Sequence, residues 1–141
     1  MSRVATVKPI DEENASPRVA AIFADIRRTK NLDRIPNFWR TLATNPALLE
    51  SVWSNLKHWM HPDQVGRESR LDARTREIIA VAVSATNGCS YCVNSHTTAL
   101  VKLGVDPETL GEILAVAGLF NMTNSLADGY QVEPDVLPPQ D

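Results

Sequence analysis

Two cysteines and a histidine lie close together in the segment NGCSYCVNSH, residues 87–96. Two residues separate Cys89 from Cys92, and three separate Cys92 from His96. The chain has 141 residues and contains no other cysteine. Such a pair can serve as a reversible dithiol, bind a metal together with the histidine, or form a structural disulfide. The segment is therefore the first candidate for chemistry in this protein.

A helix is expected over residues 89–104, beginning at about Cys89. On this helix Cys89, Cys92 and His96 lie along one face, at positions i, i+3 and i+7. His96 is the i+4 neighbour of Cys92, so the imidazole can reach the sulfur of Cys92. Both sulfurs lie in the first turn, where unpaired N–H groups and the helix dipole favour an anion and lower the pKa of a thiol.

Glu77 is the acidic residue that can join this group. A helix expected over residues 70–88 ends in an Asn-Gly pair, a good C-terminal stop. If the two helices fold back on each other about this turn, Glu77 and His96 come level, since each lies about ten residues, or ~15 Å along its own helix, from the turn. Glu77 precedes the most apolar run of the chain, IIAVAVSA, where a carboxylate needs a partner. The order Glu77–His96–Cys92 has the logic of an orienting acid, a base and a nucleophile.

Other uses of the cysteine pair remain open on the residues alone. A structural disulfide over so short a span closes too small a loop to restrict the unfolded chain much. Attached haem requires a histidine directly after the second cysteine, where Val93 stands, and the βαβ units of a thioredoxin-type domain are absent from the pattern. We expect no cofactor and no metal, but zinc is the serious rival, although no second ligand pair at knuckle spacing is present. Its ligands would be Cys89, Cys92 and His96, with Glu77, His58 or His61 as the fourth.

The rest of the chain predicts an all-α fold, a single domain of about six helices with a central antiparallel hairpin. The remaining helices are expected at residues 16–30, 35–45, 46–60 and 106–129. Ser16 and Asp106 are the expected N-caps of the first and the last of these, each followed by a proline suited to the first helical position.

Three segments are expected to lack regular structure. Residues 1–15 are interpreted as an extended arm, residues 61–69 as a polar loop and residues 129–141 as an irregular, proline-rich tail. The last helix contains two internal glycines, which leave open whether it is continuous.

Three polar residues are candidates for a supporting role in the site. Tyr91 lies between the cysteines, where it either donates a hydrogen bond to a reacting group or packs as an ordinary aromatic ring. Asn121 and Asn124 share one face of the last expected helix, as buried polar groups near the site or as surface residues. The three tryptophans are expected in the core or in a subunit interface: Trp39, Trp53 and Trp59.

Composition excludes several classes of function. A net charge of -3 and an isoelectric point of about 5.6 argue against nucleic-acid binding, which normally needs a basic surface. No apolar run approaches the ~20 residues that cross a bilayer, so no membrane association is expected. The first residues lack the apolar region of a signal peptide, and the expected location is the cytoplasm. A lone cysteine pair there is typically catalytic, redox-sensing or metal-binding.

The motif resembles a known family. A glutamate, eleven residues, and then C-x-x-C-x-x-x-H is similar to the alkylhydroperoxidase D-like branch of the carboxymuconolactone decarboxylase family. The matching residues are Glu77, Cys89, Cys92 and His96, with Tyr91 in the family's usual place. A looser similarity extends to the segment GLFNMTNSLADGY, which resembles the last helix of the family with its asparagines. Many relatives carry an arginine where this chain has Ser125.

The resemblance implies an all-helical fold assembled as trimers or hexamers, and a peroxidase mechanism. Cys92 would be the peroxidatic thiolate, activated through His96 and Glu77, and would become a sulfenic acid. Cys89 would be the resolving thiol and form the Cys89–Cys92 disulfide. A dithiol reductant, which in the family can be a lipoyl group on a carrier protein, would reopen that disulfide. The decarboxylase members generally lack the cysteine pair, so its presence favours the redox branch.

Two hypotheses stand beside the peroxidase. One is a disulfide oxidoreductase or redox sensor without peroxide turnover, and the other is a zinc-binding structural protein. A homo-oligomer is expected in any case, because the last helix contains the apolar run ILAVAGLF, which a small domain would bury against a neighbour.

Overall fold

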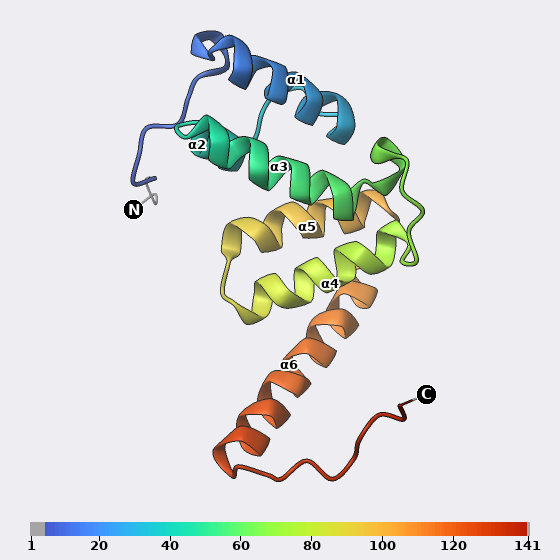
Figure 1. The fold of residues 1–141 in the computed structure, drawn as a ribbon. Helices are drawn as coiled ribbons and strands as arrows, with labels where there is room; N and C mark the ends of the chain where they lie inside the picture. The colour runs from blue at the N-terminus through green and yellow to red at the C-terminus, as the bar shows by residue number, and fades with distance from the viewer. Residues whose placement is uncertain (1–4, 141) are drawn as a thin grey trace. The chain divides into compact units, whose positions relative to one another are not determined.

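The computed structural model describes residues 5–140, and over this range the chain contains six α-helices, two short 3-10 helices and no strand (Figure 1). The all-α prediction is confirmed. The chain divides into two compact units, residues 1–70 and residues 71–141. The first unit holds α1 (Pro17–Lys30), α2 (Asn37–Leu42) and α3 (Pro46–Met60), and the second holds α4 (Ala73–Thr86), α5 (Ser90–Lys102) and α6 (Pro107–Gly129).

The helices begin where the sequence provides a cap. Ser16 precedes α1 and accepts a hydrogen bond from the backbone N–H of Val19 at 3.3 Å. Asp106 precedes α6 and accepts one from the N–H of Thr109 at 2.7 Å. Each bond satisfies an N–H that has no partner inside the helix and typically contributes about 1 kcal/mol. Both predicted caps are confirmed.

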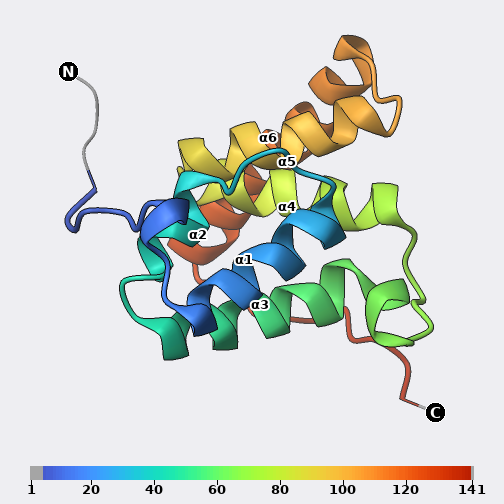
Figure 2. The same cartoon turned by 90° about the horizontal axis from the view of Figure 1, so that it is seen from above.

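The core of the first unit forms where α1 and α3 pack along each other, as Figure 2 shows, with α2 beside α3. Its tryptophans Trp39 and Trp53 meet edge to face, with ring centroids 5.3 Å apart, and both are buried. Trp59, by contrast, is 58% exposed and lies outside this core. The buried cluster consists of Val19, Phe23, Ile26, Ile35, Trp39, Ala43, Leu49 and Trp53.

The second unit is built around the antiparallel hairpin of α4 and α5, which lie side by side in Figure 1. Val81 of α4 and Leu100 of α5 are fully buried and pack with Val105. Gly88 forms the turn between the helices at φ +71°, a left-handed conformation that L side chains rarely adopt. The segment IIAVAVSA lies within α4, so the helix expected over this run is confirmed.

The last helix, α6, packs on α4 and runs unbroken through both internal glycines to Gly129. Continuity was left open by the sequence, and the structure shows a single helix of 23 residues. None of these residues is buried within the chain, although the helix is largely apolar on all sides. Because α6 extends to Gly129, the irregular tail begins one residue later than predicted, and residues 130–140 have no regular structure.

Two segments predicted to lack regular structure, the N-terminal arm and the polar loop, contain short helices in the structure. Each contains one 3-10 helix, Glu12–Asn14 in the arm and Pro62–Val65 in the loop. The arm is held against the first unit because the carboxylate of Glu12 accepts a hydrogen bond from the N–H of Ile35 at 3.2 Å. Residues 1–4 and residue 141 lie outside the described range.

A membrane-spanning element was not expected from the sequence. Within residues 5–140, no helix combines the length and the apolar character needed to cross a membrane.

Candidate active site

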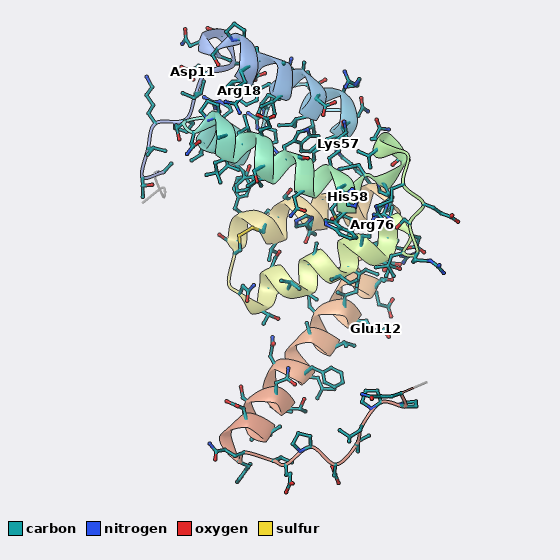
Figure 3. All side chains as sticks on the ribbon, in the orientation of Figure 1. Asp11, Arg18, Lys57, His58, Arg76 and Glu112 are labelled. Carbon is teal, nitrogen blue, oxygen red and sulfur yellow. A yellow bond between two sulfur atoms is a disulfide. The ribbon has the colours of Figure 1, made fainter. Side chains whose placement is uncertain are left out.

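The cysteine pair lies at the N-terminal end of α5, where Figure 3 shows a disulfide bond. Cys89 is the N-cap residue, and its sulfur accepts a hydrogen bond from the backbone N–H of Cys92 at 3.2 Å. Cys92 lies in the first turn of the helix. The expectation that this helix begins at about Cys89 is confirmed. The pair thus occupies the part of the helix in which a thiolate is best stabilised.

Glu77 of α4 and His96 of α5 are in contact across the hairpin. The Nδ1 atom of His96 lies 2.7 Å from Oε2 of Glu77. The side chains are partly buried, with exposed fractions of 16% for Glu77 and 25% for His96. The contact expected from the hairpin alignment is therefore present. An ionised carboxylate only accepts hydrogen bonds, so Nδ1 donates to Glu77 and the lone pair of Nε2 is free to take a proton.

Charged residues are scarce around this pair. Residues 78–101 contain no Asp, Glu, Lys or Arg, and neither do residues 113–127 of α6. Glu77, which contacts His96, is the only acidic residue of α4 and directly precedes this uncharged stretch.

The backbone of α4 also positions Cys89. The N–H of Cys89 donates to the carbonyl of Ser84 at 3.0 Å, and Ser84 is buried. Sequence reasoning did not find Ser84, because a backbone carbonyl contributes through its position and not through its side chain. Two hydrogen bonds, to Ser84 and from Cys92, thus fix the residue that begins α5.

The three candidate supporting residues are exposed. Tyr91 is 45% exposed between the two cysteines. Asn121 accepts a hydrogen bond at its Oδ1 from the hydroxyl of Thr86 at 3.2 Å. Thr86 is the last residue of α4, three positions before Cys89, so Asn121 joins α6 to the end of the hairpin that carries the cysteines. Asn124 lies on the surface of α6. Both asparagines are thus surface residues, and Asn121 is hydrogen-bonded to the hairpin.

The zinc alternative depended on the grouping of ligands. Within residues 5–140, no three His, Cys, Asp or Glu side chains are arranged to hold a metal ion. The disulfide also removes both sulfurs from the thiolate form that binds zinc. His58 and His61 belong to the first unit, where their rings lie beside Trp59 and Trp53 respectively.

The part of the chain that carries the cysteine pair matches a known protein family. The family model for the carboxymuconolactone decarboxylase family matches residues 56–132, which include the whole hairpin and all of α6. The chain belongs to this family. A crystal structure of the alkylhydroperoxidase AhpD core from Rhodospirillum rubrum is similar to the chain, with a TM-score of 0.84 and 42% identity. The match covers 94% of this chain and 96% of that one, so the fold is that of the AhpD core.

The curated relatives are alkyl hydroperoxide reductases. An alkyl hydroperoxide reductase of Mycobacterium tuberculosis is 31% identical over 115 residues, which are 82% of this chain and 31% of that protein. The alkyl hydroperoxide reductase AhpD of Streptomyces coelicolor is 26% identical over 126 residues, 89% of this chain and 67% of that protein. The chain spans about a third of the length of the first curated relatives that it matches. The family's redox branch, which the motif resembled, is thus the branch in which these relatives fall.

Proposed function

We propose that the chain is a thiol-dependent peroxidase that reduces hydroperoxides. The observation that carries this proposal is the Glu77–His96 contact one helical turn beyond a cysteine pair at the start of α5. This arrangement provides a nucleophile, a base and a group that orients the base. The alkyl hydroperoxide reductases among the relatives support the same activity.

The oxidative step uses Cys92, because it is the sulfur nearer His96. In the reduced protein, His96 takes the proton of the Cys92 thiol, and Glu77 stabilises the imidazolium. The thiolate attacks the distal oxygen of the hydroperoxide and the O–O bond breaks. The departing alkoxide takes the proton from His96 and leaves as an alcohol. Cys92 is then a sulfenic acid.

Cys89 resolves this intermediate. Cys89 first gives its thiol proton to His96. Its thiolate attacks the sulfur of Cys92, the S–O bond breaks, and the departing hydroxide takes that proton from His96 and leaves as water. The product is the Cys89–Cys92 disulfide, the state in which the structure holds the pair. A dithiol reductant then reopens the disulfide by exchange. A lipoyl group on a carrier protein is the reductant that we propose, and such a cycle requires a reducing compartment such as the cytoplasm.

We also propose that the chain works as a homo-oligomer, a trimer or a hexamer. A helix that is apolar all round is normally buried, yet α6 buries none of its residues within the chain. A second copy of the chain is the partner that the family resemblance implies. The large apolar side chains that α6 exposes are Leu114, Val116, Leu119, Phe120, Met122 and Leu126.

Rapid mixing of the reduced protein with hydrogen peroxide and with an organic hydroperoxide tests the peroxidase function. We expect fast loss of both thiols in the wild type and a one-oxygen adduct at Cys92 in the Cys89→Ser variant. Thiol counting measures the first result and mass spectrometry the second. Cys92→Ser should lose steady peroxide turnover. A wild-type rate no greater than that of a free thiol, or steady turnover by Cys92→Ser, would contradict the assignment.

Disulfide exchange without peroxide turnover is the second candidate function. The hydrogen bond from Cys92 N–H to the Cys89 sulfur favours it, because such a cap stabilises a thiolate whatever the oxidant. The same mixing experiment separates the two functions. A disulfide that is readily reduced and reoxidised, in a protein that does not consume peroxide, would indicate exchange or redox sensing.

A further inference from the structure

The two sulfurs of the disulfide have different surroundings. The sulfur of Cys89 accepts the backbone N–H of Cys92 and lies at the N-cap, before the first turn of α5. Cys92 lies inside the helix, one turn before His96. Thiol–disulfide exchange is directional, since one sulfur is attacked and the other leaves as a thiolate. The unequal surroundings therefore distinguish the two possible directions.

We propose that the reductant attacks the sulfur of Cys92 and expels Cys89 as the thiolate, so that the mixed disulfide with the reductant forms at Cys92. This inference deepens the proposed function and rests on it for the class of reductant, a dithiol. It assigns separate tasks to the two cysteines in the recycling half of the reaction.

The leaving group supports this direction. A thiol that forms a more stable thiolate leaves faster. When the disulfide opens, negative charge develops on the departing sulfur, and the hydrogen bond from Cys92 N–H to Cys89 becomes charge-assisted. The hydrogen bond is already in place in the disulfide, so no reorganisation of the backbone is needed as the charge appears.

The position of the base supports the same direction. The incoming thiol must lose a proton, and Nε2 of His96 can accept it while Nδ1 donates to Glu77. His96 is ~6 Å along the helix axis from Cys92 but ~10.5 Å from Cys89. Displacement at sulfur also requires the nucleophile to approach opposite the leaving group. Along α5, Cys89 precedes Cys92 and His96 follows it, so in sequence order the leaving sulfur and the base lie on opposite sides of Cys92.

The step balances as follows. The first thiol of the reductant gives its proton to His96, and its sulfur bonds to Cys92 as the Cys89–Cys92 bond breaks. The electron pair of that bond remains on Cys89. The second thiol of the reductant then gives its proton to the Cys89 thiolate, attacks the reductant's own sulfur in the mixed disulfide and releases Cys92 as a thiolate. The reductant loses two electrons and becomes a disulfide, while both cysteines are reduced and its two protons remain on the protein.

Trapping of the mixed disulfide tests the direction of attack. The oxidised wild-type protein would be treated with 2-mercaptoethanol, a monothiol, in the presence of excess iodoacetamide, and quenched early with acid. Cleavage after Arg76 and Lys102 releases both cysteines in one peptide, and tandem mass spectrometry locates each group. We expect mercaptoethanol at Cys92 and the alkyl group at Cys89, in roughly tenfold excess over the reverse arrangement. The reason is that the Cys89 thiolate is stabilised by a charge-assisted hydrogen bond when it leaves. Equal or reversed labelling would overturn the proposal.

A pair of variants tests the base. His96→Gln should slow formation of the mixed disulfide on the order of a hundredfold without changing which cysteine is alkylated. Ser95→Ala, an exposed neighbour on the same helix, is the matched control and should react at the wild-type rate. Circular dichroism checks that both variants are folded. An unchanged rate in His96→Gln would remove the base from the proposal.

The outcome is separable from that of the peroxidase test, because the trap contains no peroxide. A protein that fails to consume hydroperoxide but shows the expected labelling would retain the direction of exchange and lose the peroxidase function. A protein that consumes hydroperoxide but shows reversed labelling would retain the function and lose the inference.

Discussion

At the scale of single residues, Cys89 and Cys92 differ although they belong to one short motif. Cys89 is held by two backbone hydrogen bonds, one from its own N–H to Ser84 and one from Cys92 to its sulfur. Cys92 lies one helical turn before His96, the proposed base. The proposed division between a peroxidatic and a resolving cysteine thus has a physical counterpart in the way that the helix begins.

Glu77 is the residue whose charge is most easily tested. Glu77→Gln keeps the shape of the side chain but removes the negative charge that stabilises a protonated His96. We expect peroxide consumption to fall on the order of a hundredfold, the lower end of general-base effects, with the helical content unchanged. Glu112→Gln on the exposed surface of α6 is the matched control and should keep the wild-type rate. Equal rates in the two variants would show that Glu77 does not act through its charge.

At the scale of the elements, the hairpin depends on its turn. Gly88 adopts φ +71°, and no neighbouring atom lies within 4 Å of the position that a Cβ would occupy, so the cost of a side chain there comes from the backbone alone. Gly88→Ala should lower the free energy of unfolding by about 1 kcal/mol, measured by urea denaturation.

A glycine inside a helix provides the opposite control. Gly111 in α6 has ordinary helical backbone and equally open space, so Gly111→Ala should raise the free energy of unfolding by roughly 0.5–1 kcal/mol. If both variants changed stability in the same direction, the backbone explanation for Gly88 would be wrong.

The pairing of α1 with α3 includes a carboxylate that responds to pH. Burial of Asp25 raises the pKa of its carboxyl group. Hydrogen bonds from Trp53 and Lys57 and the charge of Lys57 lower that pKa by more, so it lies below the ordinary value of 3.8. A carboxyl group whose pKa is lowered on folding stabilises the fold above its unfolded pKa. This contribution is lost as the pH falls through the lower, folded pKa.

Asp25→Asn should therefore be less stable than the wild type at about pH 6, and the difference should shrink at about pH 3, which lies below the ordinary pKa of 3.8. Urea denaturation at both values measures this difference. The exposed Asp33→Asn is the control and should be close to the wild type throughout. A destabilisation of Asp25→Asn that is independent of pH would assign the effect to packing and not to charge.

At the scale of the whole molecule, assembly is expected to depend on α6. Replacing Phe120, 55% exposed in the middle of that helix, by glutamate places a charge on the proposed interface. Phe120→Glu should convert the oligomer to smaller species in light scattering at micromolar concentration. Val136→Glu, in the exposed tail at 88%, is the matched control and should leave the assembly unchanged. A monomeric wild type would contradict the proposed oligomer.

The sequence by itself determined the features that depend on neighbours along the chain. N-caps such as Ser16 and Asp106, the turn at Gly88 and the start of α5 near Cys89 are local, because a helix begins and ends through contacts within a few residues. The Glu77–His96 contact was also predictable, since a short turn between two regular helices fixes which residues come level.

Only the tertiary structure decided the features that depend on residues distant in the sequence. The 3-10 helix in the arm is held by Glu12 on the N–H of Ile35, and Asn121 reaches Thr86 from another helix. The carbonyl of Ser84 holds Cys89, a contact that no side-chain pattern reveals. Such contacts arise from packing between elements, and a local pattern carries no information about which distant group will satisfy a given hydrogen bond.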